Sequence, residues 1–148
     1  MRAVIQRVST ARVTIADTVV SAIGAGLLAL IGIANDDTEE TADWLIDKLL
    51  DLRIFENDQG KFDKSLHDIG GALLIVSQFT LLADTRNGRR PSFVAAARAE
   101  RALPLYEHAV ARARQCGVSV VTGEFGAHMQ VTLVNDGPVT IVLDSRER

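Results

Sequence analysis

Two segments carry the polar groups best suited to chemistry, and the first follows an apolar run that should form a buried strand. Its polar members are Ser77, Gln78 and Thr80. Buried polar groups need hydrogen-bond partners. These side chains either cap the strand end locally or line a pocket where hydroxyls, an amide and backbone N–H groups bind a ligand. This segment alone leaves both interpretations open.

The second segment is Asn135-Asp136-Gly137-Pro138, which separates two apolar runs. Asn, Asp and Gly favour a hairpin turn because they tolerate unusual backbone angles. A Gly–Pro bond can also be cis, at a cost of only about 0.5–1 kcal/mol relative to trans. A cis bond here would fix the direction of the neighbouring carbonyl oxygens.

Conventional catalytic machinery has no support in the sequence. The three histidines, His67, His108 and His128, are too scattered for a metal-ligand spacing, and the single Cys116 forms neither a disulfide framework nor a multi-thiolate site. No GxSxG, Walker A or GxGxxG motif occurs, which argues against an α/β-hydrolase, a P-loop NTPase or a dinucleotide enzyme. We expect neither a metal nor another cofactor.

Length and composition indicate one globular domain, residues 1–148. The chain is 47% hydrophobic and 24% charged, which excludes a disordered or coiled-coil protein. The longest apolar run, residues 23–34, is short of the ~20 residues that cross a bilayer. The opening residues contain Gln6 and Arg7 where an export signal needs apolar residues. We therefore expect a cytoplasmic protein with no membrane partner.

Charge is distributed unevenly along the chain. The formal net charge of −3 argues against a strongly basic, general nucleic-acid binder. Residues 36–63 contain ten acidic and three basic residues (net −7), whereas residues 84–114 contain seven arginines and three acids (net +4). A basic surface can approach phosphates locally, although solvated helix faces explain the same pattern more simply.

Hydrophobic periodicity predicts an α+β fold. A stripe at i, i+3, i+4 and i+7 predicts a helix over 38–52, with Asp37 and Glu40 as its capping box. A second helix should run over 103–116, limited by Pro104 and ended by Gly117. The remaining apolar segments predict many short strands in one curved, barrel-like sheet system.

The predicted strands follow from alternation and β-branched residues. The segment 3–15 should form two short strands with Val4, Val8, Val13 and Ile15 facing inward. A turn-rich loop at 56–60 predicts a small hairpin. The other expected strands are 19–23, 27–33, 72–82, 118–121, 128–134 and 139–143.

The two polar segments together resemble a known family. SQFTLLA at 77–83 and NDGPVT at 135–140 are similar to the two signature motifs of the D-aminoacyl-tRNA deacylases. The resemblance covers essentially the whole chain, through AVIQRV, IGAGLLALIGI, RIF, GKF, RPSF and GEFGAHMQV.

The resemblance implies a cytoplasmic homodimer that hydrolyses the ester of D-aminoacyl-tRNA, and of glycine mischarged on alanine tRNA, without a cofactor. It implies a site at the dimer interface, lined by Ser77, Gln78, Phe79 and Thr80 of one subunit. Gly137 and a cis Pro138 of the other subunit complete that site.

The resemblance also implies roles for these groups. Backbone N–H groups around Phe79 and Thr80 contact the oxyanion, and the carbonyls of 137–138 hold the substrate amino group. The ribose 2′-hydroxyl of the tRNA helps to activate water, and an L side chain collides with the pocket wall. Phe125 and Met129 match positions near the terminal adenosine, or else pack as ordinary apolar residues. Supporting residues are Arg7, which braces the Gly–Pro segment or faces solvent, and Asn135 and Thr140.

Two other functions stay open. A hydrolase could use Thr80 or Ser77 as a covalent nucleophile, although no base adjoins either residue in the sequence. A non-catalytic RNA-binding module could use the basic segment 86–90, against which the acidic total argues.

Overall fold

The computed structural model describes residues 1–148. The helices are α1 (Glu39–Leu50) and α2 (Ala99–Gln115), with 3-10 turns η1 (Phe79–Leu82) and η2 (Ser145–Glu147). The strands are β1 (Arg2–Ile15), β2 (Thr18–Ile23), β3 (Gly26–Gly32), β4 (Phe55–Glu56), β5 (Phe62–Lys64), β6 (Ala72–Ser77), β7 (Ser119–Thr122) and β8 (Gln130–Asp144).

The α+β prediction is confirmed, with two helices and a nearly closed, barrel-like mixed sheet. The strand order is β2-β1-β3-β6-β7, and β8 pairs along the other edge of β1. The β3–β6 and β6–β7 pairs are parallel, and the pairs made by β1 are antiparallel. Many strands are short, as expected, but β1 and β8 are long, with 14 and 15 residues.

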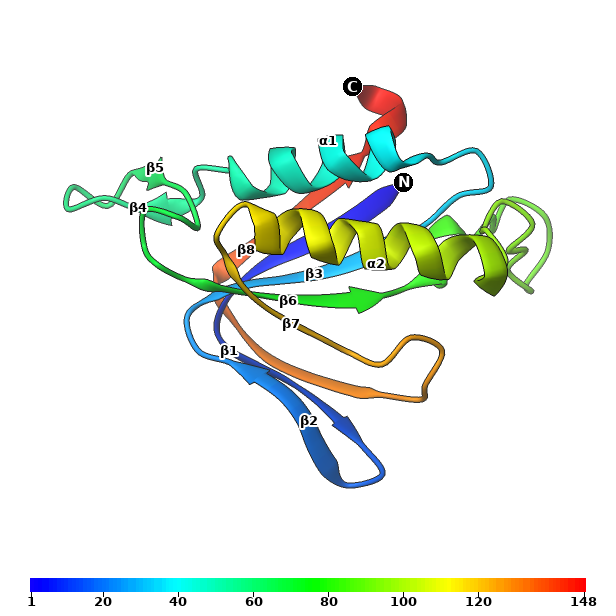
Figure 1. The fold of residues 1–148 in the computed structure, drawn as a ribbon, viewed down its shortest axis with the longest axis horizontal. Helices are drawn as coiled ribbons and strands as arrows, with labels where there is room; N and C mark the ends of the chain where they lie inside the picture. The colour runs from blue at the N-terminus through cyan, green and yellow to red at the C-terminus, as the bar shows by residue number, and fades with distance from the viewer.

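Two apolar cores lie on opposite faces of the sheet. Both helices cover one face, and the β1–β2–β8 region bends away from them (Figure 1). The core under the helices contains 25 buried residues, including Leu73 and Ile75, whereas Leu74 and Val76 belong to a second core of seven. Alternate residues of β6 therefore point to different cores, as strand geometry requires. Parallel strands buried on both faces read as continuous apolar runs.

The N-terminal segment is one strand, where the sequence predicted two. Its pairing with β8 is irregular between Gln6 and Val8 and between Val8 and Thr10. These bulges change the direction of the side chains without ending the strand. Ala3 and Ile5 consequently lie in the core under the helices, while Val8 and Val13 lie in the second core. Val4 and Ile15, expected inside, are only half-buried.

The cap of α1 lies one residue later than predicted. Thr38 is the N-cap, and its side chain and that of Thr41 form the reciprocal capping box. Asp37 instead is buried and accepts hydrogen bonds from the Met1 amino group and, at 2.7 Å, from the Ala34 N–H. Asp37 therefore ties the start of β1 to the segment before α1.

Helix α2 starts at Ala99 rather than at the predicted residue 103. Pro104 lies inside it and is exposed. A proline removes its own bond to the carbonyl four residues earlier, and its ring crowds that carbonyl, which here belongs to Glu100 in the first turn. Burial of Ala102 in the main core holds that turn in place. Gly117, with φ of +82°, follows the helix end as predicted.

The two polar segments differ from the expected strand and hairpin. Strand β6 stops at Ser77, and residues 79–82 form the 3-10 turn η1 rather than continuing the strand. Residues 135–138 are not a hairpin turn but lie within β8. Neither helix has the length and hydropathy needed to cross a membrane.

The close approach of β3 and β6 predicts a strong effect of Gly26→Ala. A methyl group at Gly26 would lie 1.9 Å from the carbonyl oxygen of Ala72, whereas one at Gly24 would meet nothing within 4 Å. Backbone cannot move aside as a flexible side chain can, so we expect Gly26→Ala to lower the unfolding free energy by about 3 kcal/mol or more. Urea denaturation measures the change.

Gly24→Ala is the matched control, and we expect it to stay within about 0.5 kcal/mol of the parent. Equal effects of the two substitutions would contradict the predicted role of the contact.

Candidate active site

The end of β6 opens into a pocket of about 420 Å³. Five parts of the chain line it: Ile33 directly after β3, the end of β6, the start of η1, the start of α2 with the residue Ala97 before it, and the segment 125–131. It brings together five residues singled out in the sequence, namely Ser77, Gln78, Phe79, Phe125 and Met129. Thr80 follows directly in η1, although it is not among the lining residues.

Backbone donors are available where β6 turns into η1. The Gln78 N–H donates to the Ile31 carbonyl at 2.8 Å, and the Leu81 N–H donates to the Gln78 carbonyl at 3.2 Å. The Phe79 and Thr80 N–H groups between them have no acceptor within the chain. The first N–H groups of a helical turn are unpaired in general. Two adjacent donors are thus free to bind a ligand beside the pocket.

The side chains of Gln78 and Thr80 engage each other. The Gln78 amide donates a hydrogen bond to the Thr80 hydroxyl, and both residues are exposed or half-exposed. The Gln78 amide is the only side-chain partner of the Thr80 hydroxyl, and an amide is not a base that could remove the hydroxyl proton. His128, which sequence reasoning assigned no role, also lines the pocket and is exposed.

Aromatic contacts hold two walls of the pocket. Phe125 packs against Tyr106 with ring centroids 5.7 Å apart, and the Tyr106 hydroxyl donates to the Ile75 carbonyl at 2.9 Å. Burial raises the pKa of Tyr106 to about 12, so its hydroxyl stays protonated as this donor. On the other side, the rings of Phe79 and Phe93 pack in a T-shaped arrangement with their centroids 5.1 Å apart.

Small residues leave the space that the pocket occupies. Ala97 lines it from just before α2, and Ala99 and Ala102 line it from the first turn of α2. Sequence reasoning missed them, although the run of alanines around this position was a visible signal. Larger side chains there would fill the pocket.

The Gly137–Pro138 segment is a bulge in β8 whose peptide bond is cis. Val8 pairs with Asn135 and Gln6 with Thr140, so five steps along β8 match two along β1. The Asn135 side chain spans the bulge, accepting from the Val139 N–H at 3.0 Å and donating to the Thr140 hydroxyl at 3.1 Å. Asn135 and Thr140 thus hold the shape of this segment.

Arg7 lies beneath the same bulge and is only 5% exposed. Its guanidinium donates to the Asp136 carbonyl at 2.9 Å and to the Ile54 carbonyl at 2.7 Å. The Glu56 carboxylate lies 3.6 Å away, and the ring of Phe62 is stacked 5.4 Å from the guanidinium carbon. Arg7 therefore braces the Gly–Pro segment against the β4–β5 hairpin and does not face solvent.

Within one chain, the two halves of the predicted site are apart. Gly137, Pro138, Asn135, Thr140 and Arg7 do not line the pocket beside Ser77. The Gly–Pro bulge contacts the hairpin through Arg7, whereas the pocket lies at the carboxyl end of β6 and the start of α2. No group of three or more His, Cys, Asp or Glu side chains is arranged to hold a metal ion.

Comparison with known proteins identifies the family. The family model described as D-Tyr-tRNA(Tyr) deacylase matches residues 4–144. The chain belongs to this family. Among its relatives, the D-aminoacyl-tRNA deacylase of Chloroflexus aurantiacus is 59% identical, over 99% of this chain and 92% of the relative. That of Thermus aquaticus is 55% identical over 100% and 97%.

Solved structures agree with this deacylase fold. A structure described as c-Myc DNA Unwinding Element Binding Protein matches with a TM-score of 0.92 and 40% identity, over 97% of this chain and 98% of that one. A probable eukaryotic D-amino acid tRNA deacylase matches with a TM-score of 0.83. At 20% identity over 96% and 97% of the chains, the second likeness shows the fold alone.

The contacts of Arg7 predict that Arg7→Met destabilises this deacylase-family chain. Methionine keeps an apolar stem but leaves the Ile54 and Asp136 carbonyls without their donor. Unsatisfied buried groups are costly, so we expect a loss of about 2–3 kcal/mol in the unfolding free energy. Urea denaturation measures it.

Arg12→Met serves as the control, because Arg12 lies on the same strand and is exposed. It should change the unfolding free energy by less than about 0.5 kcal/mol. A similarly small change for Arg7→Met would show that the buried guanidinium does not support the bulge.

Proposed function

We propose that this chain hydrolyses the ester bond of D-aminoacyl-tRNA, and of glycine mischarged on alanine tRNA, at a pocket shared between two copies. D-aminoacyl-tRNA deacylase activity, a proofreading hydrolysis, is the activity of the family to which the chain belongs. The observation that carries the finer proposal is the pair of free N–H groups at Phe79 and Thr80 beside a pocket that has no activated nucleophile.

An aminoacyl ester is reactive enough for a site of this kind. Water attacks the ester carbonyl, and the developing oxyanion accepts hydrogen bonds from the Phe79 and Thr80 N–H groups. Fixed donors aimed at a developing charge are among the strongest contributions to catalysis. The ribose 2′-hydroxyl next to the ester helps to activate the water, so the RNA supplies a group that the pocket lacks. The alcohol of the ribose leaves, and the free amino acid and tRNA are the products.

Selection for the D configuration depends on fixing two groups of the substrate. The Gly137 and Pro138 carbonyls bind the α-amino group while the ester carbonyl faces η1. Inversion of the α-carbon then exchanges its hydrogen and side chain, and an L side chain meets the wall. Rejection by collision can discriminate steeply. Glycine has no side chain to reject, so it is hydrolysed as well.

A second copy of the chain is proposed as the source of the Gly–Pro segment. Strand β8 pairs with β1 on one edge only, and its Val134 and Val142 are 56% and 62% exposed. Exposed strand edges with large apolar residues favour association with another surface. Cross-subunit contact would bring together the two halves that one chain holds apart.

The alternative of covalent catalysis by Ser77 or Thr80 gains one observation, since His128 lines the same pocket. We expect Ser77→Ala, Thr80→Ala and His128→Gln each to retain deacylation within about tenfold of the parent, because backbone groups carry the chemistry. Loss of a covalent nucleophile or its base removes several orders of magnitude. Rates of release of D-tyrosine from D-tyrosyl-tRNA, under single turnover, make the measurement.

L-Tyrosyl-tRNA is the control substrate, and the parent and all three variants should hydrolyse it far more slowly than the D ester. A drop of more than a thousandfold in one variant, with its fold intact, would favour the nucleophilic alternative. Equal rates for D and L esters in the parent would refute the proposed selectivity.

If the pocket is shared between two copies, two variants that are each inactive alone should recover activity when they form mixed dimers. Ala99→Trp fills the pocket from the exposed start of α2. Gly137→Ala distorts the Gly–Pro segment, because φ is +144° and a methyl group would lie 2.8 Å from the Val139 nitrogen. In a dimer of one copy of each, one of the two sites combines an open pocket with an intact Gly–Pro segment.

Random mixing of the two variants by co-refolding makes about half of the dimers mixed, each with one intact site. The mixture should therefore recover about one quarter of the parent activity on D-tyrosyl-tRNA, as C2 symmetry requires. If both halves act within one chain, every chain carries a defect and the mixture stays inactive.

A further inference from the structure

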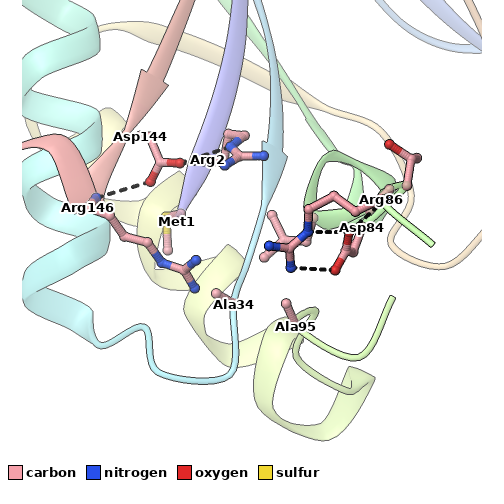
Figure 2. A pocket seen from close by; sticks show the side chains of 11 residues that line it. Met1, Arg2, Ala34, Asp84, Arg86, Ala95, Asp144 and Arg146 are labelled. Atoms are coloured by element: carbon pink, nitrogen blue, oxygen red, sulfur yellow. Dashed lines mark hydrogen bonds and ion pairs between the residues drawn. The ribbon is translucent and has the colours of Figure 1, made fainter. Parts of the chain in front are cut away.

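A second hollow of about 340 Å³ gathers guanidinium groups from three separate parts of the chain. Arg2 comes from the start of β1, Arg86 from the segment after η1, and Arg146 from η2 (Figure 2). Asp84 and Asp144 lie between these arginines in the same hollow. We call this hollow the arginine cleft.

Asp144 and Asp84 orient Arg2 and Arg86 without using all the donors of these two arginines, and the Arg146 guanidinium pairs with Asp36 at 3.3 Å. Arg2 donates through Nε and Nη2 to Asp144 at 3.0 and 2.7 Å, and Arg86 donates through Nε and Nη2 to Asp84 at 2.9 and 2.7 Å. Hydrogen bonds from the Arg86 side chain and backbone lower the pKa of Asp84 to about 2. Arg86 remains 85% exposed with Nη1 unpaired. Oriented guanidiniums with free N–H groups suit phosphate oxygens.

An exposed basic loop extends from this cleft. Two backbone hydrogen bonds between Asp84 and Ser92, of 2.8 and 2.9 Å, close residues 84–92 at their base. The loop contains Arg89 and Arg90, which are exposed and lie in no ion pair. Residues 85–92 contain no acid. Because no carboxylate of the chain pairs with these two arginines, both guanidinium groups are available to a partner.

Three segments of the chain line both the arginine cleft and the candidate active pocket. Ile33 lines the pocket and Ala34 the cleft; Phe79 lines the pocket and Leu82 the cleft; Ala97 lines the pocket and Ala95 the cleft. Neighbours one to three residues apart are separated by at most about 4–11 Å of chain. The cleft and the pocket are therefore adjacent, with η1 in the wall between them.

We infer that the arginine cleft and the loop 84–92 bind backbone phosphates of the RNA strand whose aminoacylated end enters the pocket. The inference rests on the proposed function, because it takes the ligand of the pocket to be esterified to RNA. A net charge of −3 makes a general attraction for RNA weak, so a local arginine cluster beside the pocket has to supply it. Seven of the ten acidic residues in segment 36–63 lie on α1 or the β4–β5 hairpin, and their charge repels the phosphates of the same strand. Asp36 is an exception, because it pairs with Arg146 of the cleft.

Binding of uncharged tRNA tests this inference independently of hydrolysis. We expect the double variant Arg89→Gln/Arg90→Gln to bind tRNA about tenfold more weakly than the parent near 0.15 M salt, and the slope of log K against log salt to fall by roughly 1.5. The control Lys48→Gln/Arg114→Gln removes two exposed charges from the last turns of α1 and α2. It should leave both quantities unchanged.

Two activity measurements separate this inference from the proposed function. With D-tyrosyl-tRNA, the Arg89/Arg90 variant should lose kcat/KM by about the same tenfold; with D-tyrosyl-adenosine, which has no stem, it should equal the parent. Parent-like tRNA binding and salt slope in this variant would overturn the inference. Binding of inorganic phosphate that depends on Arg89 and Arg90, without such dependence for tRNA, would also overturn it by assigning a free anion. Failure of the parent to hydrolyse either ester would refute the proposed function and leave the tRNA-binding result to decide this inference.

Discussion

The buried guanidinium of Arg7 is the interaction on which the Gly–Pro half of the molecule depends. A full charge that is 5% exposed is stable only with close acceptors. Asp136 lies in the bulge of β8 and has no partner on β1, so its carbonyl is free to accept from Arg7. The Ile54 carbonyl requires the hairpin to fold over the same point. One side chain thus joins a strand, a bulge and a hairpin.

The parallel strands β3, β6 and β7 determine where the pocket lies. Strand β6 lies between β3 and β7 and is buried on both faces, so its polar residues can begin only where the strand leaves the core. That point is Ser77. Strand β7 runs parallel to β6 and ends at Thr122, after which the chain passes through Phe125 into the pocket wall. Ligand sites outside the carboxyl ends of parallel strands recur in α/β sheets for the same geometric reason.

The sequence was sufficient to predict those parts of the structure that depend on neighbouring residues in the chain. Amphipathic periodicity located α1 and most of α2, the left-handed Gly117 marked a helix end, and the polar residues after an apolar strand marked the pocket. Local chemistry was insufficient where the outcome depends on a partner strand. Asn135 to Pro138 suit a hairpin turn and a bulge equally well, and only the long pairing with β1 selects the bulge. The same pairing keeps residues 2–15 in one strand.

Burial of Arg7 and the role of Asp37 were also beyond local patterns. A strand arginine normally faces solvent, and nothing within a few residues of Arg7 indicates that carbonyls 47 and 129 residues away will receive it. Asp37 precedes a helix and therefore suggests an N-cap, but its carboxylate instead meets Met1, which is distant in sequence. Polar residues with long-range partners are where pattern-based prediction fails.

The charge distribution is consistent with the proposed meeting of two copies. Acidic residues surround the Gly–Pro bulge, where Glu56 and Asp136 lie near Arg7 and leave their carboxylates more than half exposed. The pocket instead adjoins the arginine cleft and the loop 84–92. A Gly–Pro segment that faced the pocket of another copy would bring an acidic rim towards a basic one, and complementary potentials favour such an orientation. The same acidic rim would lie near the positively charged α-amino group of the substrate, while the phosphates stay on the basic side. The positively charged amino group of the aminoacylated RNA would then face the acidic surface, and its negatively charged phosphates would face the basic surface.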